Sequence, residues 1–168
     1  MPPRSTLVAV DTNLLLDLAV PKDRAHDAIE AFRRRVSGVE FVVPPTVIDE
    51  LDYIAMHGDS AADRQLATTA LQNLVRVWKF RALDFIPVGH GIIETVARRL
   101  RGEKLIPERE INDSYILAEA ALANCVILIT SDEHLRAADP TMLSLALKAS
   151  DVNAILVRTP REIVRQFG

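Results

Sequence analysis

Two acidic residues stand at the ends of buried-strand patterns, where a side chain is free to do chemistry. Asp11 follows the apolar run 7–10, and Asp132 follows the apolar run 126–130. Small hydroxyl or amide residues flank both acids, so the same pattern occurs twice. Because the carboxyl ends of parallel strands meet at one edge of a sheet, we expect the two acids to lie close together. This repetition is the strongest signal in the sequence.

Two further acidic residues lie near expected helix starts. Thr46 and Asp49 resemble a capping box, and Glu50 borders the apolar stripe of the helix that they would open. Asn112 is expected to be an N-cap, with Asp113 in the first turn of its helix. Taken singly, Glu50 is equally explained as a solvated flank residue. Asp113 alone is equally explained by the preference for acids at helix starts.

Four carboxylates that converge on one edge of a sheet repel one another unless a divalent cation neutralises them. Hard oxygen ligands favour Mg²⁺ or Mn²⁺. Such an ion can generate a hydroxide near neutral pH and stabilise the charge on a phosphodiester under attack. The four histidines are scattered without metal-ligand spacing. The pattern therefore favours metal-dependent phosphodiester hydrolysis over acyl transfer or glycoside hydrolysis.

Alternating strand and helix patterns must position these acids. Apolar runs predict strands, and periodic segments predict helices between them. The segment 135–149 is expected to be irregular, with short helical turns around Pro140. Thr159 and Glu162 form a capping box, with Pro160 at the first helical position. This alternation predicts an α/β fold with a mostly parallel sheet, and the chain length of 168 residues predicts one domain over 1–168. The expected strands are 7–10, 41–43, 83–88, 126–130 and 154–157, and the expected helices are 23–36, the one from 46, 61–77, 92–101, the one from 112 and the one from 159.

Composition and charge limit the class of protein and its expected location in the cell. A hydrophobic share of 49% with 26% charged residues is ordinary for a soluble globular protein. No apolar run approaches the roughly 20 residues of a membrane helix, and we see no signal peptide, so we expect a cytoplasmic protein without membrane contact. The single Cys125 excludes an internal disulfide and is expected to fill the core. A net charge of −3 argues against a protein that grips nucleic acid with its whole surface.

The densest positive charge lies just before the expected helix start at 112. It consists of Arg98, Arg99, Arg101 and Lys104. A charge run is usually a solvated face. Its closeness in sequence to Asp113 makes RNA phosphate contact the functional alternative.

Four segments in sequence order resemble the PIN-domain nucleases. They are 8–13, 47–51, 112–116 and 129–135, and the resemblance extends from about residue 6 to 158. The family resemblance implies a three-layer α/β/α sandwich and a metal-dependent phosphodiesterase, usually acting on single-stranded or structured RNA. The chain is thus expected to be an endoribonuclease similar to the bacterial VapC enzymes.

The same resemblance assigns roles to particular residues. It implies that Mg²⁺ or Mn²⁺ binds to Asp11, Glu50, Asp113 and Asp132. It also implies hydrogen-bond support for these acids from Asn13, Thr130 and Ser131. Many bacterial relatives are toxins that a small antitoxin protein inhibits, and many dimerise, so an antitoxin partner and a homodimer are expected. The stretch between Glu50 and Asp113 is longer than in a compact toxin, which weakens the toxin role more than the nuclease activity.

Other readings of the acids remain. A phosphatase of the haloacid-dehalogenase type needs a second Asp where this chain has Asn13. A receiver-like signalling domain needs an early acidic pair and a late lysine, and Lys148 is poorly placed for that role. The alternative from another class is a PIN-like binding or scaffold module with weak catalysis in RNA processing. Intact acids at all four positions argue against it.

Overall fold

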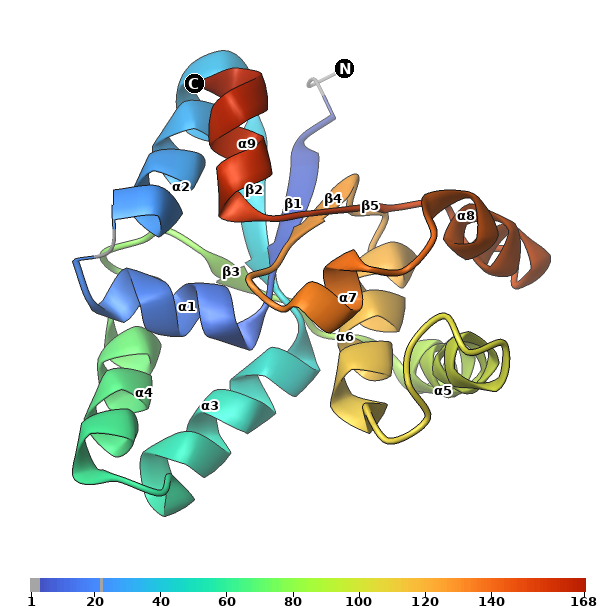
Figure 1. Ribbon diagram of the computed structural model, residues 1–168, viewed down its shortest axis with the longest axis horizontal. Coiled ribbons are helices and arrows are strands. Elements are labelled where there is room, and N and C mark those ends of the chain that lie inside the picture. The colour runs from blue at the N-terminus through green and yellow to red at the C-terminus, as the bar shows by residue number, and fades with distance from the viewer. Residues whose placement is uncertain (1–3, 22) are drawn as a thin grey trace.

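Helices surround a central parallel sheet in the computed structural model (Figure 1). The structure describes residues 4–21 and 23–168. Within these ranges, the sheet has five strands in the order β3-β2-β1-β4-β5, and all neighbouring pairs are parallel. The strands are β1 (Thr6–Val10), β2 (Val39–Val43), β3 (Arg81–Ala82), β4 (Ile127–Ile129) and β5 (Leu156–Arg158). The predicted α/β/α fold is confirmed.

The helices pack in pairs around this sheet. Helices α2 and α9 lie side by side, and α5 and α6 pack together on the other side of the sheet (Figure 1). No helix among the described residues is long and apolar enough to cross a membrane. The helices are α1 (Thr12–Ala19), α2 (Asp23–Arg35), α3 (Pro45–His57), α4 (Ala61–Asn73), α5 (Pro87–Gly102), α6 (Ile111–Leu122), α7 (Glu133–Arg136), α8 (Pro140–Ala149) and α9 (Pro160–Phe167).

The strand order places β1 beside β4 at the centre of the sheet. From β1 the chain builds the sheet in one direction through β2 and β3, and it later returns to add β4 and β5 on the other side of β1. Val10 of β1 pairs with Ile129 of β4. In open α/β sheets, ligands bind outside the carboxyl ends of the strands at such a reversal. The fold therefore brings the residues after Val10 and after Ile129 together at a typical ligand position.

Local sequence explains how β1 and α1 join without a loop. Val8, Ala9 and Val10 are fully buried, as expected for a strand covered on both faces. Asp11 then serves as the N-cap of α1, and its Oδ1 accepts a hydrogen bond of 2.9 Å from the backbone N–H of Leu14. The sequence did not reveal this helix as a separate element, because its apolar residues follow the strand so closely.

Three expected elements were wrong or misplaced. The strand over 83–88 is absent from the described structure, because Pro87 instead starts α5, where its missing N–H and fixed φ suit the first turn. The helical turns expected around Pro140 are present but form a longer, regular helix: α7 ends at Arg136, and α8 runs from Pro140 to Ala149 with Asp139 as its side-chain cap. The helix expected over 61–77 ends at Asn73.

Two predicted helix caps were also wrong, and the third was confirmed. Pro44 is the N-cap of α3 and Glu110 is the N-cap of α6, in both cases without a side-chain cap bond. Thr46 and Asn112 lie inside these helices and bond elsewhere. The capping box of α9, formed by Thr159 and Glu162, is present as predicted.

Candidate active site

Asp11 is a buried carboxylate held from two sides. Its side chain is only 3% exposed. Oδ1 caps α1, and Oδ2 accepts a hydrogen bond from the hydroxyl of Thr130, which follows β4. Burial raises the pKa of Asp11 to about 7, against the lowering effect of these hydrogen bonds, and nearby Asp132 and Glu50 raise it further. The protein therefore holds Asp11 in place but does little to neutralise its charge.

Glu50 reaches the same region from α3. The hydroxyl of Thr12 donates a hydrogen bond of 2.8 Å to its Oε1, and the side chain of Asn112 on α6 also hydrogen-bonds to it. Partial burial raises the pKa of Glu50, and Asp132 adds to this effect. Three separate elements, α1, α3 and α6, thus converge on this carboxylate.

Asp113 lies in the first turn of α6 and is half-buried. Burial raises its pKa to about 7, and the charges of Asp132, Glu110, Glu50 and Asp11 raise it further. Asp132 caps α7 by accepting a hydrogen bond of 2.7 Å from the backbone N–H of His134. Each of the four predicted acids therefore lies within electrostatic range of the others.

The charges of the four acids act on one another, but in the described structure their side chains are not arranged around a common metal-binding position. Among residues 4–21 and 23–168, no group of three or more acidic, histidine or cysteine side chains is arranged to hold a metal ion. The donor set nevertheless fits a hard divalent cation, because every functional atom in it is a carboxylate oxygen. Burial and the neighbouring carboxylates raise the pKa of Asp11 and of Asp113, and a cation bound beside them would favour their charged forms.

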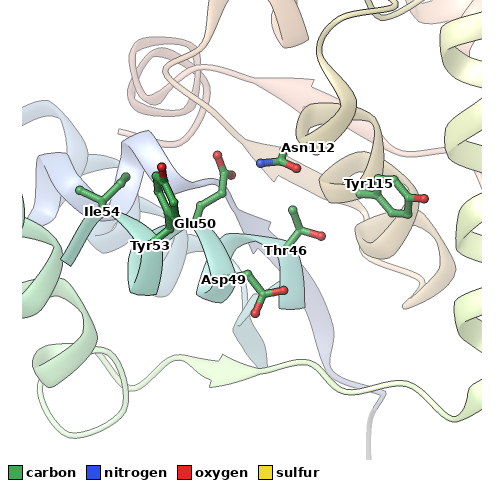
Figure 2. Close-up of a pocket in the computed structure, with 7 residues that line it drawn as sticks. All are labelled: Thr46, Asp49, Glu50, Tyr53, Ile54, Asn112 and Tyr115. Atoms are coloured by element: carbon green, nitrogen blue, oxygen red, sulfur yellow. The ribbon is translucent and has the colours of Figure 1, made fainter. Parts of the chain in front are cut away.

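A cavity of about 600 Å³ opens beside Glu50. Figure 2 shows that it lies between α3 and α6, with Glu50 and Asn112 facing the gap. Tyr53 and Tyr115 also line it, and Tyr53 is 66% exposed although it is aromatic. The cavity therefore exposes Glu50 beside two aromatic rings.

The predicted supporting residues differ in what they contact. Thr130 donates a hydrogen bond to Asp11, the kind of support expected of it. Ser131 instead donates a hydrogen bond of 3.1 Å to Asp17. Asn13 is exposed, and no hydrogen bond joins its side chain to the four acids in the described part of the chain. Its neighbour Thr12 takes the supporting position, which the sequence motif contained but did not single out.

A second pair missed by sequence reasoning links the helices that carry the acids. Glu119 on α6 is 5% exposed and accepts two hydrogen bonds from Thr46 on α3, one from the backbone N–H (3.0 Å) and one from the hydroxyl (2.8 Å). This contact joins the first turn of α3 to α6 and so fixes Glu50 relative to Asp113. A buried Glu needs such a partner, but the sequence alone does not show that Glu119 is buried.

The basic segment near the end of α5 is largely engaged with other side chains. Arg98 and Arg99 form ion pairs with Glu94 and Glu103, at 2.5 and 3.9 Å. Arg101 differs from them, because it donates a hydrogen bond to Ser114, the residue after Asp113. Lys104 is exposed beyond the helix end. Of the four, Arg101 lies nearest to the acids along the contacts that the structure defines.

Comparison with known proteins identifies the family. The PIN domain matches residues 8–139, which include all four acids, the end of β1 and the whole of β4. The chain belongs to the PIN domain family. Proteins of this family are nucleases and generally use divalent metal ions. No curated protein matches the sequence itself.

Solved structures similar to this PIN domain agree on the fold. They include VapBC2 from Rickettsia felis bound to a DNA fragment from its promoter, at 15% identity and a TM-score of 0.61, covering 92% of this chain and 98% of that one. FitAcB from Neisseria gonorrhoeae has 13% identity and a TM-score of 0.55, with the same coverage of 92% and 98%. FitAB bound to an IR36 DNA fragment has 16% identity and a TM-score of 0.57, covering 91% and 94%. At these identities the likeness concerns the fold alone.

Proposed function

We propose that this PIN domain protein is a metal-dependent endoribonuclease that hydrolyses RNA phosphodiester bonds. The observation that carries the proposal is the convergence of four carboxylates, from different elements, at the carboxyl end of the sheet, where burial and neighbouring acids raise the pKa of Asp11 and of Asp113 to about 7. Proteins rarely maintain such charge unless it has a function. A scaffold module has no need of it.

Asp11, Glu50, Asp113 and Asp132 are the residues that would hold Mg²⁺ or Mn²⁺. When bound, such an ion supplies a hydroxide near neutral pH and stabilises developing charge on the phosphodiester. The chain itself fixes the ligands in place: Thr130 orients Asp11, while Thr12 and Asn112 orient Glu50. This arrangement is prepared before substrate arrives, which lowers the cost of ordering the site.

The basic segment and the partners belong to the same proposal. Arg101, with Arg98, Arg99 and Lys104 around it, contacts RNA phosphates beside Asp113. If the double variant Arg98→Ala, Arg101→Ala leaves the salt dependence of RNA binding unaltered, these residues form only a solvated face. We further propose a cytoplasmic homodimer with a small antitoxin partner, a role supported by the likeness in fold to the VapBC2 and FitAB proteins. Co-purification with the product of a neighbouring small gene tests that partner.

The decisive experiment measures cleavage of a mixed structured RNA pool with Mg²⁺ or Mn²⁺. EDTA and the Asp11→Asn variant are the two controls. Cleavage that is lost in both controls supports the proposed activity. If Asp11→Asn cleaves RNA as well as the wild type does, Asp11 is not part of the catalytic site. Absence of both cleavage and metal binding would favour the scaffold alternative.

A further inference from the structure

A second cavity, of about 710 Å³, borders the acidic site next to Asp132. Ser131 and Glu133, the residues on either side of Asp132 in the chain, both line it. The cavity at Glu50 is lined by α3 and α6, whereas this one is lined by the last turn of α1 and by the starts of α2, α7 and α9. The two cavities thus reach the acids from different elements.

Two arginines line this second cavity from neighbouring helices. Arg24 lies in the first turn of α2, and Arg161 lies in the first turn of α9. These helices lie side by side and begin at the same end, toward α1 and α7 (Figure 1). Both side chains are exposed. The fold therefore places two guanidinium groups at one mouth of the acidic site.

Among the residues that the structure describes, these arginines have no acidic partner, unlike other arginines near the site. Within the described part of the chain, neither Arg24 nor Arg161 forms an ion pair or a side-chain hydrogen bond. By contrast, Arg136 and Arg158 both pair with Glu162 on α9. A guanidinium group offers several N–H donors in a fork that matches phosphate oxygens. An exposed, unpaired arginine in a hollow is therefore well suited to bind phosphate.

Two acidic residues, Asp17 and Glu133, also line this cavity and affect how it would bind phosphate. Asp17 accepts a hydrogen bond from Ser131, and Glu133 lies in the first turn of α7, where an acid suits the helix dipole. Together they offset the charge of the two arginines. The cavity should therefore bind phosphate by direct contact with the guanidinium groups and not by attraction over a long range.

We propose that Arg24 and Arg161 bind backbone phosphates of the RNA strand that flank the bond cleaved at the acidic site. The inference rests on the proposed function and adds a binding surface to it. The strand occupies the cavity beside Glu50, crosses the acids and continues into the cavity beside Asp132. The two arginines then hold the strand on the α2 and α9 side.

The test measures binding without cleavage. Asp11→Asn serves as the background, and a fluorescein-labelled, mixed-sequence oligoribonucleotide is the probe, with affinity followed by anisotropy over a KCl series at constant Mg²⁺. Two double variants are made in this background. One combines Arg24→Ala with Arg161→Ala, and the matched control combines Arg34→Ala with Arg165→Ala. The control removes the same charges from the same two helices at positions outside the cavity.

Each lost phosphate contact lowers the salt dependence of single-strand binding by about 0.7 in the log–log slope, so the Arg24, Arg161 variant should lose about 1.4. The control variant should keep the slope of the background protein. Equal slopes in the two double variants would overturn this inference while leaving RNA binding, and the proposed function, in place. Failure of the background protein to bind the probe even at low salt would overturn both.

Discussion

Replacing Asp11 should stabilise the metal-free protein, and the gain should depend on pH. Burial holds the pKa of Asp11 at about 7 in the folded protein, whereas its ordinary value is 3.8. Because the folded state binds this proton more tightly than the unfolded chain, the stability of the fold falls as pH rises from 3.8 to about 7. This difference in pKa corresponds to a loss of roughly 4 kcal/mol in the free energy of unfolding, and the loss is complete above pH 7.

The Asp11→Asn variant removes the charge and keeps the contacts. The amide oxygen still caps the N–H of Leu14, and the hydroxyl of Thr130 can accept a hydrogen bond from the amide nitrogen. In EDTA, the variant should therefore exceed the wild type in free energy of unfolding by roughly 4 kcal/mol at about pH 8. At about pH 5 the gain should shrink to roughly 1.5 kcal/mol.

Urea unfolding followed by circular dichroism measures both values. Asp27→Asn, at an exposed position on α2, is the control and should change stability little at either pH. A gain that is equal at both pH values, or a loss of stability at the higher pH, would refute burial of charge as the property of this site. Addition of Mg²⁺ or Mn²⁺ should then stabilise the wild type and affect Asp11→Asn far less, which tests the metal site independently of activity.

Three further predictions concern other parts of the fold. Glu119→Ala should lower the free energy of unfolding by about 1–3 kcal/mol. Combined with Thr46→Val, the loss should be smaller than the sum of the two single losses, and additive losses would show that the two residues do not interact. Arg136 holds the pKa of Glu162 at about 2, below its usual 4.5, so this contribution to stability is present above pH 4.5 and is lost as pH falls toward 2. Glu162→Gln should flatten that acid limb in pH-dependent unfolding, and an unchanged limb would contradict the assignment. Gly38 has a φ of 70°, so Gly38→Ala should cost about 1 kcal/mol in thermal unfolding and Gly38→Asn less, while equal losses would exclude backbone strain.

The sequence determined the fold class and the members of the acidic set. Strand patterns depend on local runs of apolar residues, so β1 and β4 could be found without the structure, and an acid after each run marked the edge where they end. Caps that use only neighbouring residues were equally visible, as at Thr159. The family resemblance depends on the same segments, and the PIN domain match confirmed it.

The tertiary structure decided everything that depends on residues far apart in the chain. Thr46 looked like a local cap, but Glu119 lies 73 positions away and offers a buried acceptor that Asp49 cannot match. Asn112 likewise hydrogen-bonds to Glu50 and not to its own helix. Local propensity is worth about 1 kcal/mol at a cap, whereas leaving a buried carboxylate without partners costs more, so packing overrides the local preference. For the same reason, Arg24 and Arg161 meet at one cavity only because α2 and α9 pack side by side.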